Sequence, residues 1–107
     1  MIWHTVRISF KDVPDEVRLD VERGLADLPD VVPGIAWFRI GRETADPDVS
    51  LVVSAFETLA KLDAYRTHPY HRPAQEALHG SGARILGMSD METGDDPFGP
   101  IAQKPKD

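Results

Sequence analysis

The chain has 107 residues, no cysteine and a formal net charge of −6 at pH 7. This length suits a single domain, and the lack of cysteine excludes disulfides, thiolate metal sites and cysteine nucleophiles. Basic residues form no cluster, no apolar run reaches the ~20 residues of a membrane span, and no basic-then-apolar leader opens the chain. We therefore expect a cytoplasmic protein that binds neither nucleic acid nor membrane.

The first segment, residues 2–11, alternates between apolar and polar side chains, which predicts a half-buried strand. His4 falls on the apolar face, between Ile2 and Val6. A buried imidazole needs a hydrogen-bond partner, because an unpaired polar group costs stability. His4 is therefore either a satisfied core histidine or part of a site.

A helix is predicted after Pro14, which suits a first helical turn. Val17, Val21, Leu25 and Leu28 recur at spacings of four, four and three, as on one apolar stripe. We expect Pro29 to end this helix. The charged residues between the stripe positions are interpreted as a solvated face. This face comprises Arg18, Asp20, Glu22, Arg23 and Asp27.

Two further strands are predicted at residues 35–42 and 49–57, joined by a connection too short for a helical crossover. Trp37 and Phe38 are adjacent, so a strand directs them to opposite faces. Both faces of the sheet then need apolar cover. For so small a domain, a second copy of the chain is the simplest cover for the second face.

A second helix is predicted after Thr58, a suitable cap. We expect Leu59, Leu62 and either Tyr65 or the aliphatic stem of Arg66 to point inward. His68 precedes Pro69 and should end this helix. A short helix over residues 73–79 and a last strand over residues 83–92 follow.

The predicted order is strand, helix, strand, strand, helix, strand. It indicates an α+β fold, a ferredoxin-like βαββαβ protomer with an antiparallel four-stranded sheet, forming a dimeric α+β barrel. Residues 1–92 make the domain. Residues 93–107, rich in Gly, Pro and Asp, are expected to form a flexible or surface-hugging tail.

Four motifs resemble the stress-responsive dimeric α/β-barrel (Dabb) domain family. They are Met-Ile-x-His-x-Val at residues 1–6, Leu-Pro-x-Val-x-Pro-Gly at 28–34, Phe-x-x-Gly-Arg at 38–42 and Tyr-x-x-His-Pro-x-His at 65–71. The resemblance implies a homodimer, and it extends to polyketide cyclases such as olivetolic acid cyclase. By that resemblance the active-site residues are His4, Tyr65 and His71, with no cofactor. Where that cyclase has a further histidine on its third strand, this chain has Ser50, which is a departure from the cyclase's pattern.

The residues, together with what the resemblance implies, leave three functions open. A cofactor-free cyclase or lyase acting on a hydrophobic or phenolic small molecule would use His71 as general base, Tyr65 to hydrogen-bond the base or the enolate, and His4 to orient or protonate the substrate. The alternatives are a non-catalytic stress-responsive homo-oligomer and a cofactor-independent monooxygenase. A metal site at His4, His68 and His71 is disfavoured, because Pro69 breaks the helix between the last two.

Overall fold

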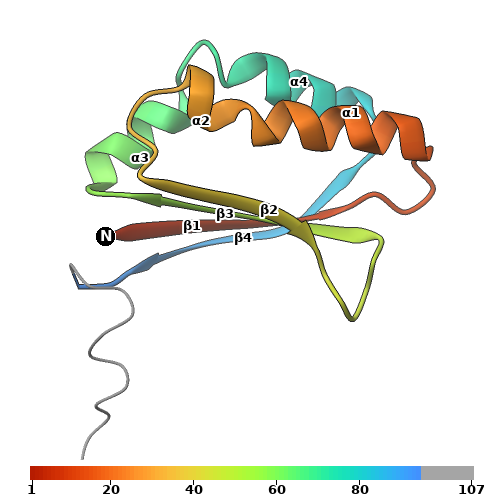
Figure 1. The fold of residues 1–107 in the computed structure, drawn as a ribbon, viewed down its shortest axis with the longest axis horizontal. Coiled ribbons are helices and arrows are strands. Elements are labelled where there is room, and N and C mark those ends of the chain that lie inside the picture. The colour runs from red at the N-terminus through yellow and green to blue at the C-terminus, as the bar shows by residue number, and fades with distance from the viewer. Residues whose placement is uncertain (95–107) are drawn as a thin grey trace, which may run out of the picture.

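The computed structural model describes residues 1–94 and contains one sheet with helices on a single face (Figure 1). None of the helices in this range is both long and apolar enough to cross a membrane. The elements in chain order are β1 (Ile2–Ser9), α1 (Asp15–Ala26), α2 (Leu28–Val31), β2 (Trp37–Arg42), β3 (Val49–Phe56), α3 (Leu59–Arg66), α4 (Arg72–Gly80) and β4 (Arg84–Glu92).

The four strands are antiparallel and lie in the order β2-β3-β1-β4. This is the ferredoxin-like βαββαβ arrangement that the sequence predicts. In this order the first strand, β1, lies inside the sheet, and the last strand, β4, lies next to it at one edge. Residues 93–94 continue past β4, and the greater part of the predicted tail, residues 95–107, lies outside the described residues.

The core lies between the sheet and the helices. Its most deeply buried large side chains are Ile8, Leu28, Phe56 and Leu62. Thr58 caps α3 as predicted, since its hydroxyl accepts a hydrogen bond from the Lys61 backbone N–H at 3.2 Å. Leu59, however, was expected to point inward and is 56% exposed. The apolar contacts of α3 come from Leu62 and Tyr65, further along the helix.

The interpretation of the charged face of α1 is wrong for Arg18, which is only 5% exposed, whereas Val17 is 37% exposed. Positions 18, 21, 25 and 28 form a stripe as regular as positions 17, 21, 25 and 28. The helix is rotated so that the arginine faces the core. Pro29 also does not end the helical segment, because α1 stops at Ala26 and Pro29 lies within α2.

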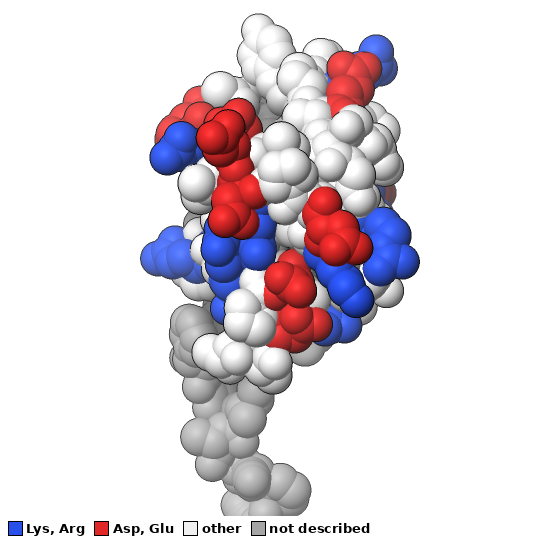
Figure 2. All heavy atoms as spheres, turned by 90° about the vertical axis from the view of Figure 1, so that its right-hand side faces the viewer, with Lys and Arg blue, Asp and Glu red and all other residues white. Residues whose placement is uncertain are grey.

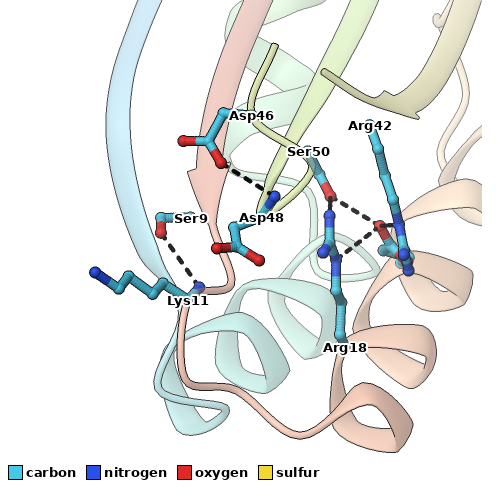
Figure 3. Close-up of polar contacts among 8 residues, drawn as sticks. Ser9, Lys11, Arg18, Arg42, Asp46, Asp48 and Ser50 are labelled. Atoms are coloured by element: carbon cyan, nitrogen blue, oxygen red, sulfur yellow. Dashed lines mark hydrogen bonds and ion pairs between the residues drawn. The ribbon is translucent and has the colours of Figure 1, made fainter. Parts of the chain in front are cut away.

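Arg18 is directed toward Ser50, with which it shares a polar cluster (Figure 3), and its guanidinium also lies over the ring of Phe10. Its Nη2 donates to Ser50 Oγ at 3.1 Å, its Nε donates to Glu22 Oε2 at 3.3 Å, and its guanidinium lies 5.0 Å from the centre of the Phe10 ring. Arg42 Nη2 donates to the other oxygen of Glu22 at 2.7 Å. Ser50 is therefore part of a structural ion-pair cluster that joins α1 to β2 and β3.

Acidic and basic side chains lie side by side on the end of the molecule seen in Figure 2. Among the described residues, two arginines have acidic partners: Arg42 pairs with Glu22, and Arg7 Nε lies 2.6 Å from Glu43 Oε2. This mixture of charges differs from the clustered basic side chains that phosphate binding needs.

Replacing Glu22 with glutamine should lower the free energy of unfolding by about 3 kcal/mol, because the buried Arg18 would lose its counter-charge. Burial works to raise the pKa of Glu22, but hydrogen bonds from Arg42 and Ser50 outweigh it and hold that pKa below its ordinary 4.5. The stabilisation is therefore complete above pH 4.5 and is lost as the pH falls through the lower, folded-state pKa.

Urea unfolding at pH 7 and pH 3 measures this effect. Glu43→Gln is the matched control, since it breaks an ion pair whose arginine is exposed and should change little. Equal stabilities for Glu22→Gln and the parent chain at pH 7 would contradict the expectation.

Candidate functional site

His4 lies on the helix-facing side of β1 and is 7% exposed, as the strand alternation predicts. Its partner is Asp90, which the register of β1 and β4 places directly opposite. His4 Nδ1 lies 2.7 Å from Asp90 Oδ1. Because an ionised carboxylate only accepts hydrogen bonds, Nδ1 carries the proton, and Nε2 is left for a ligand.

Asp90 also binds Arg66, whose Nη2 donates to its second oxygen at 2.5 Å. The hydrogen bond from His4, aided by Arg66, lowers the pKa of Asp90 below its ordinary 3.8 despite the opposing effect of burial. The carboxylate is therefore ionised at neutral pH. The three side chains form a chain of charge-assisted hydrogen bonds from β1 through β4 to α3.

Tyr65 and His71 form the second part of the site. Their rings stack with centres 4.2 Å apart, and His71 Nδ1 lies 3.1 Å from the Tyr65 backbone carbonyl oxygen. A carbonyl can only accept, so Nδ1 donates and Nε2 holds the lone pair of the neutral ring. The break between α3 and α4 is what allows the ring of His71 to fold back on Tyr65.

Burial shifts the pKa of each ring in the direction that favours its neutral form. Burial lowers the pKa of His71 below its ordinary 6.5, and hydrogen bonds with the backbone of Tyr65 and Arg66 offset only part of this effect. Burial also raises the pKa of the Tyr65 phenol to about 12. At neutral pH the imidazole is thus an unprotonated base and the phenol remains a hydrogen-bond donor.

His4, Tyr65 and His71 line the same cavity, which has a volume of about 250 Å³. The cavity lies between the sheet and α3 and α4, and Arg66 and Gln75 also border it. Most of its remaining wall is aliphatic or thioether: Val6, Ile8, Leu25, Val52, Leu78, Ile85 and Met88. An apolar cavity with a few convergent polar groups is the usual form of a small-molecule site.

Other residues named from the sequence lie outside this cavity. His68 Nδ1 accepts a hydrogen bond from the Tyr70 backbone N–H at 3.1 Å, which is a local turn contact. Ser50 belongs to the Arg18 cluster and is absent from the cavity lining. Within residues 1–94, no three His, Cys, Asp or Glu side chains gather in a way that could hold a metal ion.

The role of Asp90 was missed from the sequence, although a signal for it existed. The predicted topology makes the first and last strands neighbours, and Asp90 shares the alternation of Met88 on the cavity side. What the sequence lacked was the register, because sliding β4 by one residue would turn Asp90 to the opposite face.

These features define a small ferredoxin-like α+β protein with an apolar cavity edged by two histidines and a tyrosine. The family model of the stress responsive A/B barrel domain matches residues 2–86, and the chain belongs to that family. No functionally curated protein sequence matches the chain significantly.

Solved structures confirm the fold at low sequence identity. A protein from Deinococcus radiodurans provisionally classed as an antibiotic biosynthesis monooxygenase is similar with a TM-score of 0.74 and 15% identity, over 90% of this chain and 95% of that one. The cofactor-independent oxygenase SnoaB from Streptomyces nogalater is similar with a TM-score of 0.72 and 14% identity, and the match covers 89% of this chain and 94% of that one. A dimeric ferredoxin-like protein of unknown function from Bacteroides fragilis has a TM-score of 0.64 and 22% identity, with 86% of this chain and 96% of that one covered.

The lowered pKa of His71 makes a direct prediction for NMR. Its ring protons should titrate with a midpoint below 6.5, because burial penalises the imidazolium. As the pH falls below 6.5, the unfolded chain takes up this proton before the folded chain does, so stability should decrease with falling pH. A midpoint at or above 6.5, assigned by comparison with His71→Gln, would contradict the burial seen here.

Proposed function

We propose that this protein is a cofactor-free enzyme that removes a proton from a hydrophobic or phenolic small molecule, with His71 as general base. The observation that carries the proposal is the state of His71: its Nδ1–H is held by the Tyr65 carbonyl, its ring borders the cavity, and burial keeps it neutral. A neutral imidazole with a free Nε2 is suited to take a proton from a carbon between two carbonyl groups or from a phenol.

Tyr65 and His4 are assigned supporting roles in that step. The phenol of Tyr65, protonated because burial raises its pKa to about 12, would donate a hydrogen bond to the enolate oxygen. His4, oriented by Asp90 through Nδ1, would bind or protonate the substrate through Nε2. These roles follow the resemblance of His4, Tyr65 and His71 to the active-site residues of olivetolic acid cyclase.

The size and lining of the cavity indicate the class of substrate. At about 250 Å³ it falls just below the ~300 Å³ at which sites for drug-sized ligands begin. A compound with a single ring, or a short polyketide chain that closes to one, suits this volume. The aliphatic wall favours a neutral carbon skeleton whose oxygens meet the polar groups.

A second candidate function is a cofactor-independent monooxygenase, which the structural similarity to SnoaB favours. Proton removal is the first step of both reactions. The carbanion then attacks a carbonyl carbon of the same molecule in a cyclase, whereas it reacts with dioxygen in an oxygenase. A non-catalytic, stress-responsive homo-oligomer remains the third candidate, in which the same residues only stabilise the assembly.

We further infer that two copies pair through the sheet face opposite the helices. Trp3 and Trp37 lie there in an edge-to-face pair with ring centres 5.4 Å apart, and Trp37 is 36% exposed. Met91, opposite Trp3 in the register, is 58% exposed. An exposed apolar patch of this kind marks an interaction surface, and the Bacteroides fragilis neighbour is dimeric.

The catalytic proposal predicts that His71→Ala lowers turnover of a β-keto or anthrone-type aromatic by at least ~100-fold, the usual contribution of a general base. His68→Ala is the matched control and should retain activity, because His68 lies outside the cavity lining. Product formation and oxygen uptake, followed together, separate the functions: oxygen consumption identifies the monooxygenase, and product without it the cyclase. Equal turnover in both variants would refute His71 as base.

The dimer proposal predicts that Trp37→Glu yields monomers in light scattering, since a charge in an apolar interface is left unpaired. Leu59→Glu, at an exposed position on α3, is the control and should leave the mass unchanged. A dimeric mass for Trp37→Glu would place the interface elsewhere.

A further inference from the structure

The hydrogen-bond partners of the two cavity histidines leave both rings in the same tautomer. His4 Nδ1 lies 2.7 Å from Asp90 Oδ1, and His71 Nδ1 lies 3.1 Å from the Tyr65 backbone carbonyl oxygen. Neither partner has a hydrogen to donate, so the neutral form of each ring carries its proton on Nδ1 and its lone pair on Nε2. The cavity is therefore bordered by two imidazole acceptors.

Two acceptors restrict which ligand oxygens suit the cavity. A carbonyl or ether oxygen only accepts hydrogen bonds, so a ligand with such oxygens alone would leave both lone pairs unpaired beside a mostly aliphatic wall. A hydroxyl donates to an imidazole nitrogen and still accepts from the Tyr65 phenol or the Gln75 amide, which border the same cavity. A site that pairs with a hydroxyl discriminates strongly against an analogue that lacks it.

Asp90 sets the tautomer of His4, and Arg66 sets how the side chain at position 90 is used. Arg66 Nη2 donates to Asp90 Oδ2 at 2.5 Å, so the carboxylate meets a permanent donor on one oxygen and His4 on the other. An asparagine at this position would direct its oxygen to Arg66, because a guanidinium only donates. Its NH₂ group would then face His4, which could accept only through an unprotonated Nδ1 and would carry its proton on Nε2.

We propose that the cavity takes a neutral ligand with two hydroxyl groups, phenolic or enolic, one for each histidine, and that Asp90 selects the hydroxyl at His4. Asp90 is a positioning residue, because it contacts His4 but is not among the residues that line the cavity. The ligand class rests on the use of the cavity as a small-molecule site proposed above, and it requires no turnover.

The probes are the three isomers of benzenediol and their monomethyl ethers, with dissociation constants measured by calorimetry at neutral pH. The parent chain should bind the best diol about tenfold more tightly than its ether, because methylation leaves one buried imidazole without a donor. Asp90→Asn should lower this ratio about tenfold, because the Nε2–H of His4 would pair with the ether oxygen. The bulk of the methyl group is the same for both chains and does not change the comparison.

Nitrogen NMR of the histidine rings reads the tautomer directly, with the His4 signals assigned from His4→Gln. Nε2 of His4 should lack a proton in the parent chain and carry one in Asp90→Asn. Asp63→Asn is the matched control, because Asp63 also pairs with Arg66, at 3.4 Å, but has no contact with His4 among the described residues. This variant should change neither the tautomer nor the ratio of affinities.

Three results with the parent chain alone would overturn the proposal: a protonated Nε2 on His4, equal affinities for diols and ethers, or no binding of any diol. An unchanged ratio in a folded Asp90→Asn chain would overturn the role of Asp90. None of these results depends on whether His71→Ala abolishes turnover. Failure of the ligand class is therefore distinguishable from failure of the catalytic proposal.

Discussion

The site depends on the pairing of β1 with β4. A histidine on the buried face of a strand must have a polar partner, and this pairing supplies one by placing Asp90 opposite His4. Arg66 then completes the group from α3. One register thus satisfies a buried imidazole, fixes its tautomer and ties the helix layer to the edge of the sheet beside the cavity.

The same burial that requires this partner also sets the chemistry of the neighbouring rings. Taking an imidazole and a phenol out of water disfavours the charged form of each. His71 therefore stays neutral and basic, whereas Tyr65 stays protonated and able to donate. The cavity is thus bordered by one acceptor and one donor at neutral pH.

Two polar clusters lie on the helix-facing side of the sheet, and they differ in how completely their polar atoms are paired. Arg18, Glu22 and Ser50 hydrogen-bond to one another, Arg18 lies over the Phe10 ring, and none of the three lines the cavity that holds His4 and His71. His4 and His71 instead keep a ring nitrogen free beside that cavity. A buried ionisable group therefore indicates a site only where its bonding is left incomplete.

The sequence by itself determined the order of elements, the buried face of β1 with His4, the cap at Thr58 and the grouping of Tyr65 with His71, because these follow from local periodicity and local backbone chemistry. It did not determine that Arg18 is buried, that Leu59 is exposed, or that Asp90 and Arg66 complete the site. A helix with two equally regular stripes is oriented only by packing, and a strand partner is known only once the register is set. The orientation of the helix and the register of the strand are both set by contacts between segments far apart in the chain, and only the tertiary structure supplies these contacts.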